Sequence, residues 1–104
     1  MEIKQTDVYV RWFRRLKDVR GKARINIALQ QCRVADEVVG DVKSVGDGVY
    51  ELRVHTGPGY RLYYMVKGKE IMLLVVGGDK SSQRRDIEQA KKLAAEIVEE
   101  GKWQ

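Results

Sequence analysis

Two consecutive β-hairpin patterns between residues 50 and 80 constrain the fold of this chain more than any other feature. Polar and apolar residues alternate from Tyr50 to His55, which is the period of a half-buried strand. Alternation returns over residues 60–64. Residues 71–76 are all apolar, as is typical of a central strand covered on both faces. The stretch therefore predicts three neighbouring antiparallel strands.

Glycine-containing turns are expected to join these strands. Pro58 and Gly59 suit the central positions of a type II turn, because glycine tolerates the positive φ that the second position requires. Gly68-Lys69 suits a two-residue type II′ turn in which Lys67 lies opposite Glu70. Both hairpins are then closed by short, locally encoded turns.

The register of the hairpins decides which polar side chains share a face. Opposed residues of an antiparallel pair lie on the same face, so alternate residues of both strands reach the core only if the first loop is odd-numbered or bulged. Arg53 then lies opposite Arg61 or Tyr63. In the second hairpin, the expected turn places Tyr63 opposite Leu74 and Arg61 opposite Val76. We therefore expect a face that is partly cationic and partly apolar.

Helical periodicity precedes the strands. Apolar residues recur every three or four positions from Val8 to Val19 and again from Ile25 to Cys32. Gly21 lies between the two segments and suits the C-cap of the first helix. Two helices joined by so short a link are expected to pack as an antiparallel hairpin.

The remaining segments complete an α+β fold. Residues 2–4 form a possible edge strand. Residues 42–45 form a short strand that places Lys43 and Val45 on one side and ends at the turn signal Asp47-Gly48. An amphipathic helix is expected over residues 82–100. The predicted fold is an N-terminal helical hairpin on a small, mainly antiparallel sheet, plus a C-terminal helix, in one domain spanning residues 1–104.

The positive charge is concentrated in the first third of the chain. The net charge is +5, and residues 1–35 contain nine Lys/Arg against three acids. A basic surface favours an anionic partner, although a solvated helical face is the simpler explanation. The lone Cys32 is expected to be a core residue, because nothing nearby would activate its thiol.

The sequence also bears on location. One cysteine forms no internal disulfide, the N-terminal residues MEIKQTD lack the apolar segment of a signal peptide, and no apolar run approaches the length of a membrane span. A cytoplasmic protein without a membrane partner is therefore expected.

Two strings carry a family resemblance: ELRVHTGPGYRLYY at residues 51–64 and VVGGDKSSQRRDIEQA at residues 75–90. They resemble the small toxins of the RelE/ParE superfamily from type II toxin-antitoxin modules, and GPGYR and GGDKS resemble its HigB-like branch of addiction-module killer proteins. The resemblance covers nearly the whole chain. It implies a RelE-like fold, in which a helical hairpin packs on one face of a sheet and the other, concave face does the work.

The resemblance implies several functions. Members similar to RelE and HigB cleave messenger RNA, usually on the ribosome, and they are neutralised by an antitoxin, here expected to carry a helix-turn-helix DNA-binding domain. Members similar to ParE instead inhibit DNA gyrase without nuclease chemistry. A third alternative is a non-catalytic co-repressor that acts with its antitoxin. The expected partners for the first function are the ribosome, mRNA and the antitoxin.

The residue types favour RNA cleavage without a metal. One histidine and scattered acids predict no metal site and no cofactor. RNA supplies its own nucleophile, the 2′-hydroxyl, and arginine forks suit the charge of the phosphorane. The candidate catalytic residues are Arg61, Arg53, Lys80, Lys43, His55 and Tyr63.

Roles within this set are partly open. Arg61 and Arg53 are expected to stabilise transition-state charge. Lys43 and Lys80 are candidates for proton transfer with His55 as the alternative, since the C-terminal Tyr or His of many ribosome-dependent members is replaced here by residues 102–104, KWQ. Tyr63 is expected to stack on a base or orient the phosphate.

Two further expectations concern the charged residues. Glu51 pairing with one of the cations on a merely solvated face is the alternative to a functional face. The cations expected to hold ribosomal RNA phosphates are Arg11, Arg14, Arg15, Arg20, Lys22 and Arg24.

Overall fold

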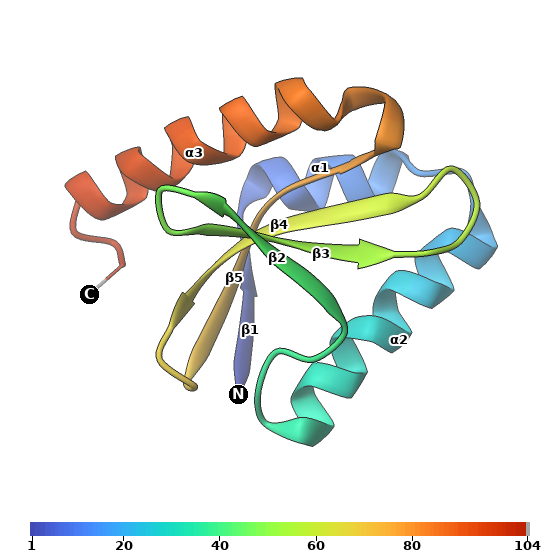
Figure 1. Ribbon diagram of the computed structural model, residues 1–104, viewed down its shortest axis with the longest axis horizontal. Coiled ribbons are helices and arrows are strands. Elements are labelled where there is room, and N and C mark those ends of the chain that lie inside the picture. The colour runs from blue at the N-terminus through green and yellow to red at the C-terminus, as the bar shows by residue number, and fades with distance from the viewer. Residues whose placement is uncertain (104) are drawn as a thin grey trace.

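The computed structural model describes residues 1–103 and shows an α+β architecture (Figure 1). Gln104, the last residue of the predicted C-terminal segment, lies outside the described residues. The elements in chain order are β1 (Glu2–Gln5), α1 (Asp7–Arg15), α2 (Val19–Ala35), β2 (Asp41–Gly46), β3 (Val49–Val54), β4 (Tyr60–Lys67), β5 (Ile71–Asp79), the 3-10 turn η1 (Lys80–Ser82) and α3 (Gln83–Glu99). The sheet order is β1-β5-β4-β3-β2, and only the β1–β5 pair is parallel among these strands.

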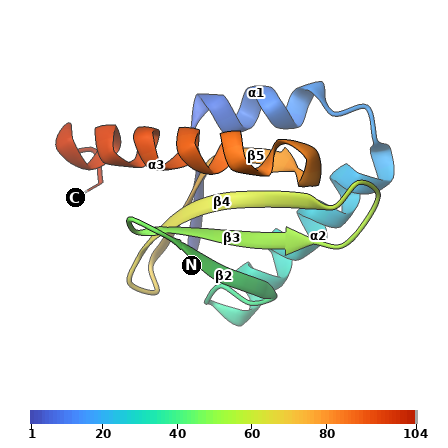
Figure 2. The same cartoon turned by 45° about the horizontal axis from the view of Figure 1, so that its top comes forward.

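Apolar side chains cover both faces of the sheet. Ile25 and Leu29 of α2 belong to one cluster with Leu62 of β4. Ala90 of α3 belongs to a second cluster with Tyr63 of β4, on the other face. Helix α3 packs mainly over β4 and β5 on the face that was expected to be concave and open, so that face is partly covered (Figure 2).

The predicted break between the first two helices is present, but its position was wrong. Helix α1 ends at Arg15, and the Asp18 side chain caps α2 by accepting a hydrogen bond from Gly21 N at 2.9 Å. Gly21 therefore lies inside the first turn of α2 instead of ending α1. Val19 is 78% exposed, although its spacing predicted a core position. Figure 2 shows α1 and α2 diverging from their short connection.

The first hairpin has the predicted parity. Val54 pairs with Tyr60, which leaves the odd-numbered loop 55–59, and Arg53 lies directly opposite Arg61. The turn type was wrong, because Gly59 N donates to Thr56 O at 3.0 Å and Gly57, with a φ of 53°, takes the first central position.

The second hairpin differs from the prediction in register. Lys67 pairs with Ile71, so the turn has three residues. A β-bulge also shifts the register between β4 and β5 at the step from Tyr63 to Tyr64. As a result Tyr63 lies opposite Val76 and Arg61 lies opposite Gly78, not opposite Leu74 and Val76 as predicted. Leu74 pairs with Tyr64 and belongs to the cluster under α1 and α2, because the longer turn shifts the pairing by one residue. The bulge follows Leu74 on β5, and Val75 and Val76 both lie in the other cluster.

The Gly77-Gly78 pair lets two helices approach the backbone of β5. A Cβ atom on Gly77 would overlap the Trp12 ring of α1, and one on Gly78 would overlap the Asp86 carboxylate of α3. Asp79 then caps η1 by accepting a hydrogen bond from Ser81 N at 2.8 Å, and α3 follows. Within residues 1–103, no helix is long and apolar enough to cross a membrane.

Candidate functional site

Strands β2, β3 and β4 place polar side chains in two adjacent cross-strand rows on the face that α3 partly covers. Opposed residues share a face, so each row is set by strand register alone. The first row is Lys43, Glu51 and Tyr63, and the second is Asp41, Arg53 and Arg61.

Glu51 is the centre of this cluster and is completely buried. Its Oε1 accepts a hydrogen bond from Arg53 Nε at 2.8 Å, and its Oε2 accepts one from Gln83 Nε2 at 3.1 Å. Arg61 Nε lies 3.6 Å from Oε2. The carboxylate therefore joins β3, β4 and the first residue of α3, and both arginines are paired with the same acid.

The surroundings keep Glu51 ionised. Burial alone would raise the pKa of its carboxyl group, but hydrogen bonds from Arg53 and Gln83 and the charge of Lys43 outweigh burial, so the pKa lies below its ordinary value. The same hydrogen bond raises the pKa of Arg53. A buried charge is stable only when it is paired. The Glu51 carboxylate therefore holds Arg53 by a hydrogen bond and Arg61 by a longer ion-pair contact, in which Arg61 Nε makes no hydrogen bond among the described residues.

The outer nitrogens of the two arginines are the chemically available part of the cluster. Their side chains are 31% (Arg53) and 11% (Arg61) exposed. Among residues 1–103, the Arg53 Nη atoms donate no hydrogen bond, and Arg61 Nη1 makes one long contact, 3.5 Å, to Gly59 O. Pairing through Nε thus leaves donors for a phosphate group.

Tyr63 lies beside Glu51 but is completely buried. Its hydroxyl has no hydrogen-bond partner among the described residues, and burial together with the Glu51 charge raises the pKa of the phenol. The ring packs in the cluster under α3, so it is not available to stack on a base as expected.

His55 and Asp41 form a pair at the rim of the cluster. His55 Nε2 lies 2.6 Å from Asp41 Oδ2, and both side chains are exposed. This contact lowers the pKa of Asp41. Because Asp41 lies opposite Arg53 in the register, the pair adjoins the arginines, and an acid that orients a histidine is a common arrangement for proton transfer.

The two candidate lysines lie at opposite ends of the cluster. Lys43 lies opposite Glu51 on β2 and is exposed. Lys80 directly follows β5, and Gly59 lies between Lys80 and Arg61. A Cβ atom added to Gly59 would be 3.9 Å from Arg61 Nη1 and 3.9 Å from Lys80 Cβ. The predicted convergence of cations is therefore centred on Arg53 and Arg61.

Three contributors to this site were not among the predicted site residues. Glu51 was expected only as a partner that would neutralise a cation. The sequence signal for its position was the two-residue spacing from Arg53, which places both side chains on the same face of β3. Asp41 and Gln83 lie 10 or more residues from Glu51 in sequence, so no local pattern indicates their contacts.

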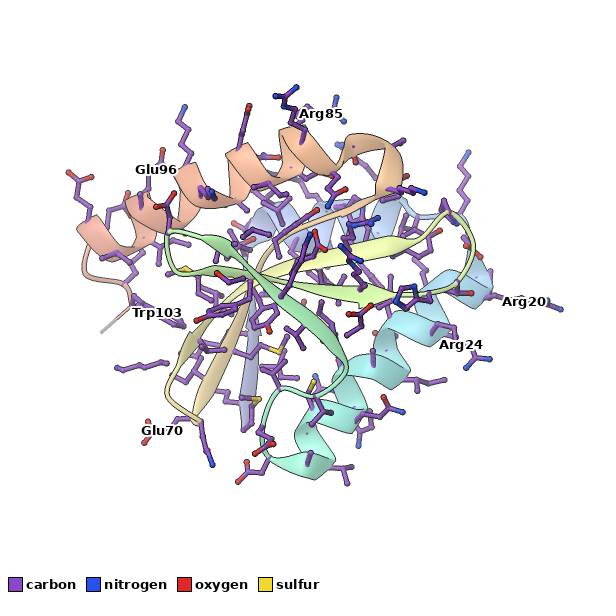
Figure 3. All side chains as sticks on the ribbon, in the orientation of Figure 1. Arg20, Arg24, Glu70, Arg85, Glu96 and Trp103 are labelled. Atoms are coloured by element: carbon purple, nitrogen blue, oxygen red, sulfur yellow. The ribbon has the colours of Figure 1, made fainter. Side chains whose placement is uncertain are left out.

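The predicted RNA-binding cations occupy the outer surfaces of the first two helices. Exposed members are Arg11, Arg14 and Arg15 on α1 and Arg20 and Arg24 on α2. Figure 3 shows where Arg20 and Arg24 lie. Lys22 is less free, because its Nζ lies 5.2 Å from the centroid of the Phe13 ring, a cation–π contact.

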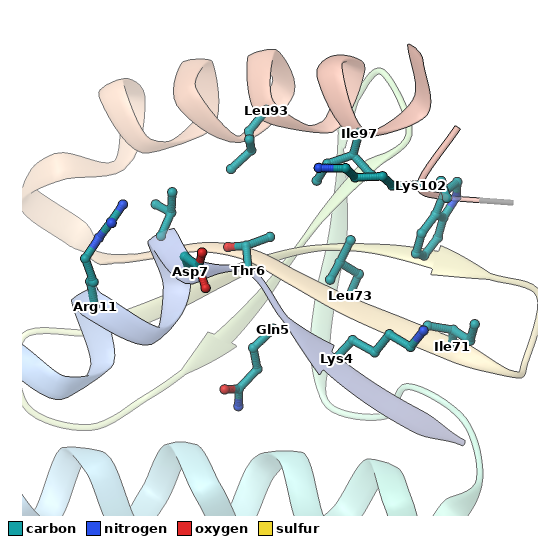
Figure 4. A pocket seen from close by; sticks show the side chains of 12 residues that line it. Lys4, Gln5, Thr6, Asp7, Arg11, Ile71, Leu73, Leu93, Ile97 and Lys102 are labelled. Carbon is teal, nitrogen blue, oxygen red and sulfur yellow. The ribbon is translucent and has the colours of Figure 1, made fainter. Parts of the chain in front are cut away.

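A hollow between β5, α1 and α3 lies away from Arg53 and Arg61. Its volume is about 580 Å³, and Leu73 of β5, Leu93 and Ile97 of α3, and Trp103 supply its apolar lining (Figure 4). Lys4, Arg11 and Lys102 add positive charge. Within residues 1–103, no three His, Cys, Asp or Glu side chains are grouped as a metal site.

Solved structures show the same fold. A chain of the RelB-RelE antitoxin-toxin complex from Methanococcus jannaschii matches with a TM-score of 0.62 and 15% sequence identity, covering 79% of this chain and 95% of that one. A chain of the intact E. coli RelBE toxin-antitoxin complex matches with a TM-score of 0.59 and 14% identity, covering 75% and 94%. At these identities the likeness concerns the fold alone.

Sequence comparisons show the family. An uncharacterized protein of Haemophilus influenzae is 42% identical over 97 residues, which is 93% of this chain and 96% of that protein. Residues 11–98 match the family described as "Phage derived protein Gp49-like (DUF891)". Since this match spans most of the sequence, including both arginines and Glu51, the chain belongs to the phage-derived Gp49-like family.

Proposed function

We propose that this chain is the toxin of a type II toxin-antitoxin pair, of the HigB-like kind, and that it is a metal-independent, ribosome-dependent mRNA endoribonuclease. Its Gp49-like family and its fold, shared with RelB-RelE complexes, support the toxin class. The observation that carries the activity is the pair Arg53 and Arg61, opposed across β3 and β4 and held through Nε by one buried carboxylate.

The arginine pair suits a transesterification of RNA. The 2′-oxygen forms a bond to the neighbouring phosphorus while its proton passes to a base. The bond from phosphorus to the 5′-oxygen then breaks, and that oxygen receives a proton. The intermediate phosphorane carries more negative charge than the diester, and preorganised Nη donors of Arg53 and Arg61 stabilise this excess charge. Glu51 positions both groups without touching the RNA.

For the proton transfers we favour His55. It is exposed and pairs with Asp41, which lies opposite Arg53, and imidazole is the side chain most often used in general acid–base catalysis. Lys43 and Lys80 are the other candidates, since each adjoins the cluster.

The basic helix surfaces supply the proposed ribosome contact. Arg11, Arg14 and Arg15 project from α1 with no acid among the exposed residues of its last two turns. Contacts of this kind to RNA phosphates weaken steeply with salt. The proposed partners are thus the ribosome with its mRNA in the cytoplasm, and an antitoxin with a helix-turn-helix domain.

Induction of the chain in bacterial cells, followed by mapping of new transcript ends, tests this function. Wild type is expected to arrest growth and to produce cuts inside translated regions that keep the reading frame. Arg61→Ala should lower cleavage by about 10²-fold or more, because it removes a charge-stabilising donor. Arg85→Ala is the matched control, since Arg85 projects from the outer side of α3 (Figure 3).

Two results would contradict the proposal. Growth arrest without new transcript ends, and with a DNA-damage response, would indicate a gyrase inhibitor. Absence of arrest by the wild-type chain, with an intact fold by circular dichroism, would leave only a co-repressor role.

A further inference from the structure

The outer face of α2 carries an apolar stripe that no described part of the chain covers. Val19 and Val34 are each 78% exposed, and Ile27 is 48% exposed. Together with the exposed Ala23 they recur at spacings of four and seven, so they lie on one side of the helix. The core residues Ile25 and its neighbours occupy the opposite side, which makes α2 apolar on both faces.

The C-terminal half of the stripe also borders a groove. A shallow groove of about 330 Å³ runs along it between Ile27 and Ala35, and Val34 supplies one wall. Apolar side chains placed singly on a surface need no explanation, but a row of them along four helical turns marks an interaction site.

Positive charge borders the stripe on both sides. By helix geometry Arg20 and Arg24 lie along one border, and Lys22 and Arg33 along the other. Residues 19–35 contain no acid. Figure 3 shows Arg20 and Arg24 projecting from α2 away from the sheet.

This combination selects the kind of partner. A second copy of the chain packed stripe to stripe would bring two rows of cations together, which like-charge repulsion disfavours. RNA would use the cations but would leave Val19, Ile27 and Val34 in contact with water or phosphate. An amphipathic helix with apolar residues at three- and four-residue spacing and acids on both flanks satisfies the apolar stripe and both charged borders.

We propose that the α2 stripe docks such an acidic amphipathic helix of the cognate antitoxin, an inference that rests on the proposed function. Helix α2 has 17 residues and is therefore about 25 Å long, which fits a partner helix of about four turns. The stripe and the Glu51 cluster lie on opposite sides of the sheet. Docking there leaves the arginines uncovered and instead occupies Arg20 and Arg24, so the antitoxin competes with ribosomal RNA for the same cations.

The test uses the full chain and the protein encoded by the adjoining reading frame as the antitoxin. The double variant Ile27→Glu/Val34→Glu places acids in the stripe, and Val98→Glu, at a 52% exposed site on α3, is the matched control. Thermal melting checks that both variants fold. Calorimetric titration is expected to show the double variant binding roughly 100-fold more weakly than wild type and the control binding as wild type does. In cells, the double variant should still arrest growth, and the antitoxin should no longer relieve that arrest.

The binding and growth measurements distinguish failure of this docking site from failure of the proposed function. Unchanged antitoxin affinity in the double variant overturns the docking site, and so does a loss confined to ribosome or RNA binding. A wild-type dimer that the double variant dissociates also overturns it, in favour of self-association. Growth arrest by wild type needs no antitoxin, so its absence refutes the proposed function independently. Failure of wild type to bind the adjoining protein refutes the named occupant.

Discussion

Glu51 Oε1 accepts a hydrogen bond from Arg53 Nε at 2.8 Å, and this carboxylate is completely buried while the guanidinium group reaches the surface. The contact therefore connects the interior of the sheet to the proposed RNA-binding face. Release of Arg53 would leave an unpaired charge in the interior, which is strongly unfavourable. The arginine pair is consequently preorganised before any substrate binds.

Glu51→Gln should lower both stability and activity. The amide keeps the shape but loses the charge that holds Arg53 and Arg61, so we expect a loss of about 2 kcal/mol in unfolding free energy and about 10-fold or more in cleavage rate. Urea denaturation and a cleavage assay measure the two effects. Activity equal to wild type would contradict the positioning role.

The pH dependence of the same variant gives an independent check. The pKa of Glu51 is lowered in the folded chain, so its stabilisation is complete above its ordinary pKa of about 4.5 and is lost as the pH falls through the folded value. The difference in stability between wild type and Glu51→Gln should thus be constant at neutral pH and shrink only in acid. A difference that shrinks at alkaline pH would have another origin.

His55→Ala should reduce cleavage by about 10²-fold with little effect on stability, because the side chain is exposed and acts in proton transfer. Added imidazole should restore part of the activity, which a purely structural role would not allow. Lys43→Ala and Lys80→Ala measured in parallel decide among the three candidates. A larger loss in either lysine variant than in His55→Ala would reassign the proton transfer.

Tyr60 should make stability sensitive to alkali. Its hydroxyl donates to Asp18 Oδ2 at 2.7 Å, and burial together with this hydrogen bond raises the pKa of Tyr60 to about 12. The contribution is complete below the ordinary pKa of about 10 and is lost as the pH rises through about 12. Tyr60→Phe should melt a few degrees lower than wild type at neutral pH, and the gap should close in strong alkali.

Gly77→Ala should destabilise the chain by about 3 kcal/mol or prevent folding, because the added methyl group overlaps the Trp12 ring. In a Trp12→Ala background the space is open, so the same substitution should cost much less. A double-mutant cycle in denaturant measures this coupling. Additive effects would show that the Trp12 ring does not restrict this position.

The Arg14→Ala/Arg15→Ala variant should bind ribosomes more weakly at every salt concentration, since both residues are exposed cations of α1. The slope of log affinity against log salt should fall by roughly 1 to 2, one for each phosphate contact removed. Lys92→Ala on α3 is the control. An unchanged slope would remove these arginines from the ribosome contact.

Local pattern determined much of this fold and part of the site. Strict alternation in β3 and β4 fixes which residues share a face, and this parity required an odd loop, so that Arg53 opposite Arg61 was one of the two predicted pairings. Helical spacing likewise located α1, α2 and α3. These features depend on contacts between near neighbours in sequence, so the spacing of apolar residues along the chain is sufficient to predict them.

Only the tertiary structure decided how these parts meet. The three-residue turn and the bulge opposite Tyr63 and Tyr64 each shifted the register by one residue and together moved Arg61 from Val76 to Gly78. The passage of α3 over the sheet brought Gln83 to Glu51 and buried Tyr63. Asp18 began a new helix and left Val19 exposed on its outer face. Such outcomes follow from packing between distant segments, where several local arrangements have similar energies and burial of the shared core selects one.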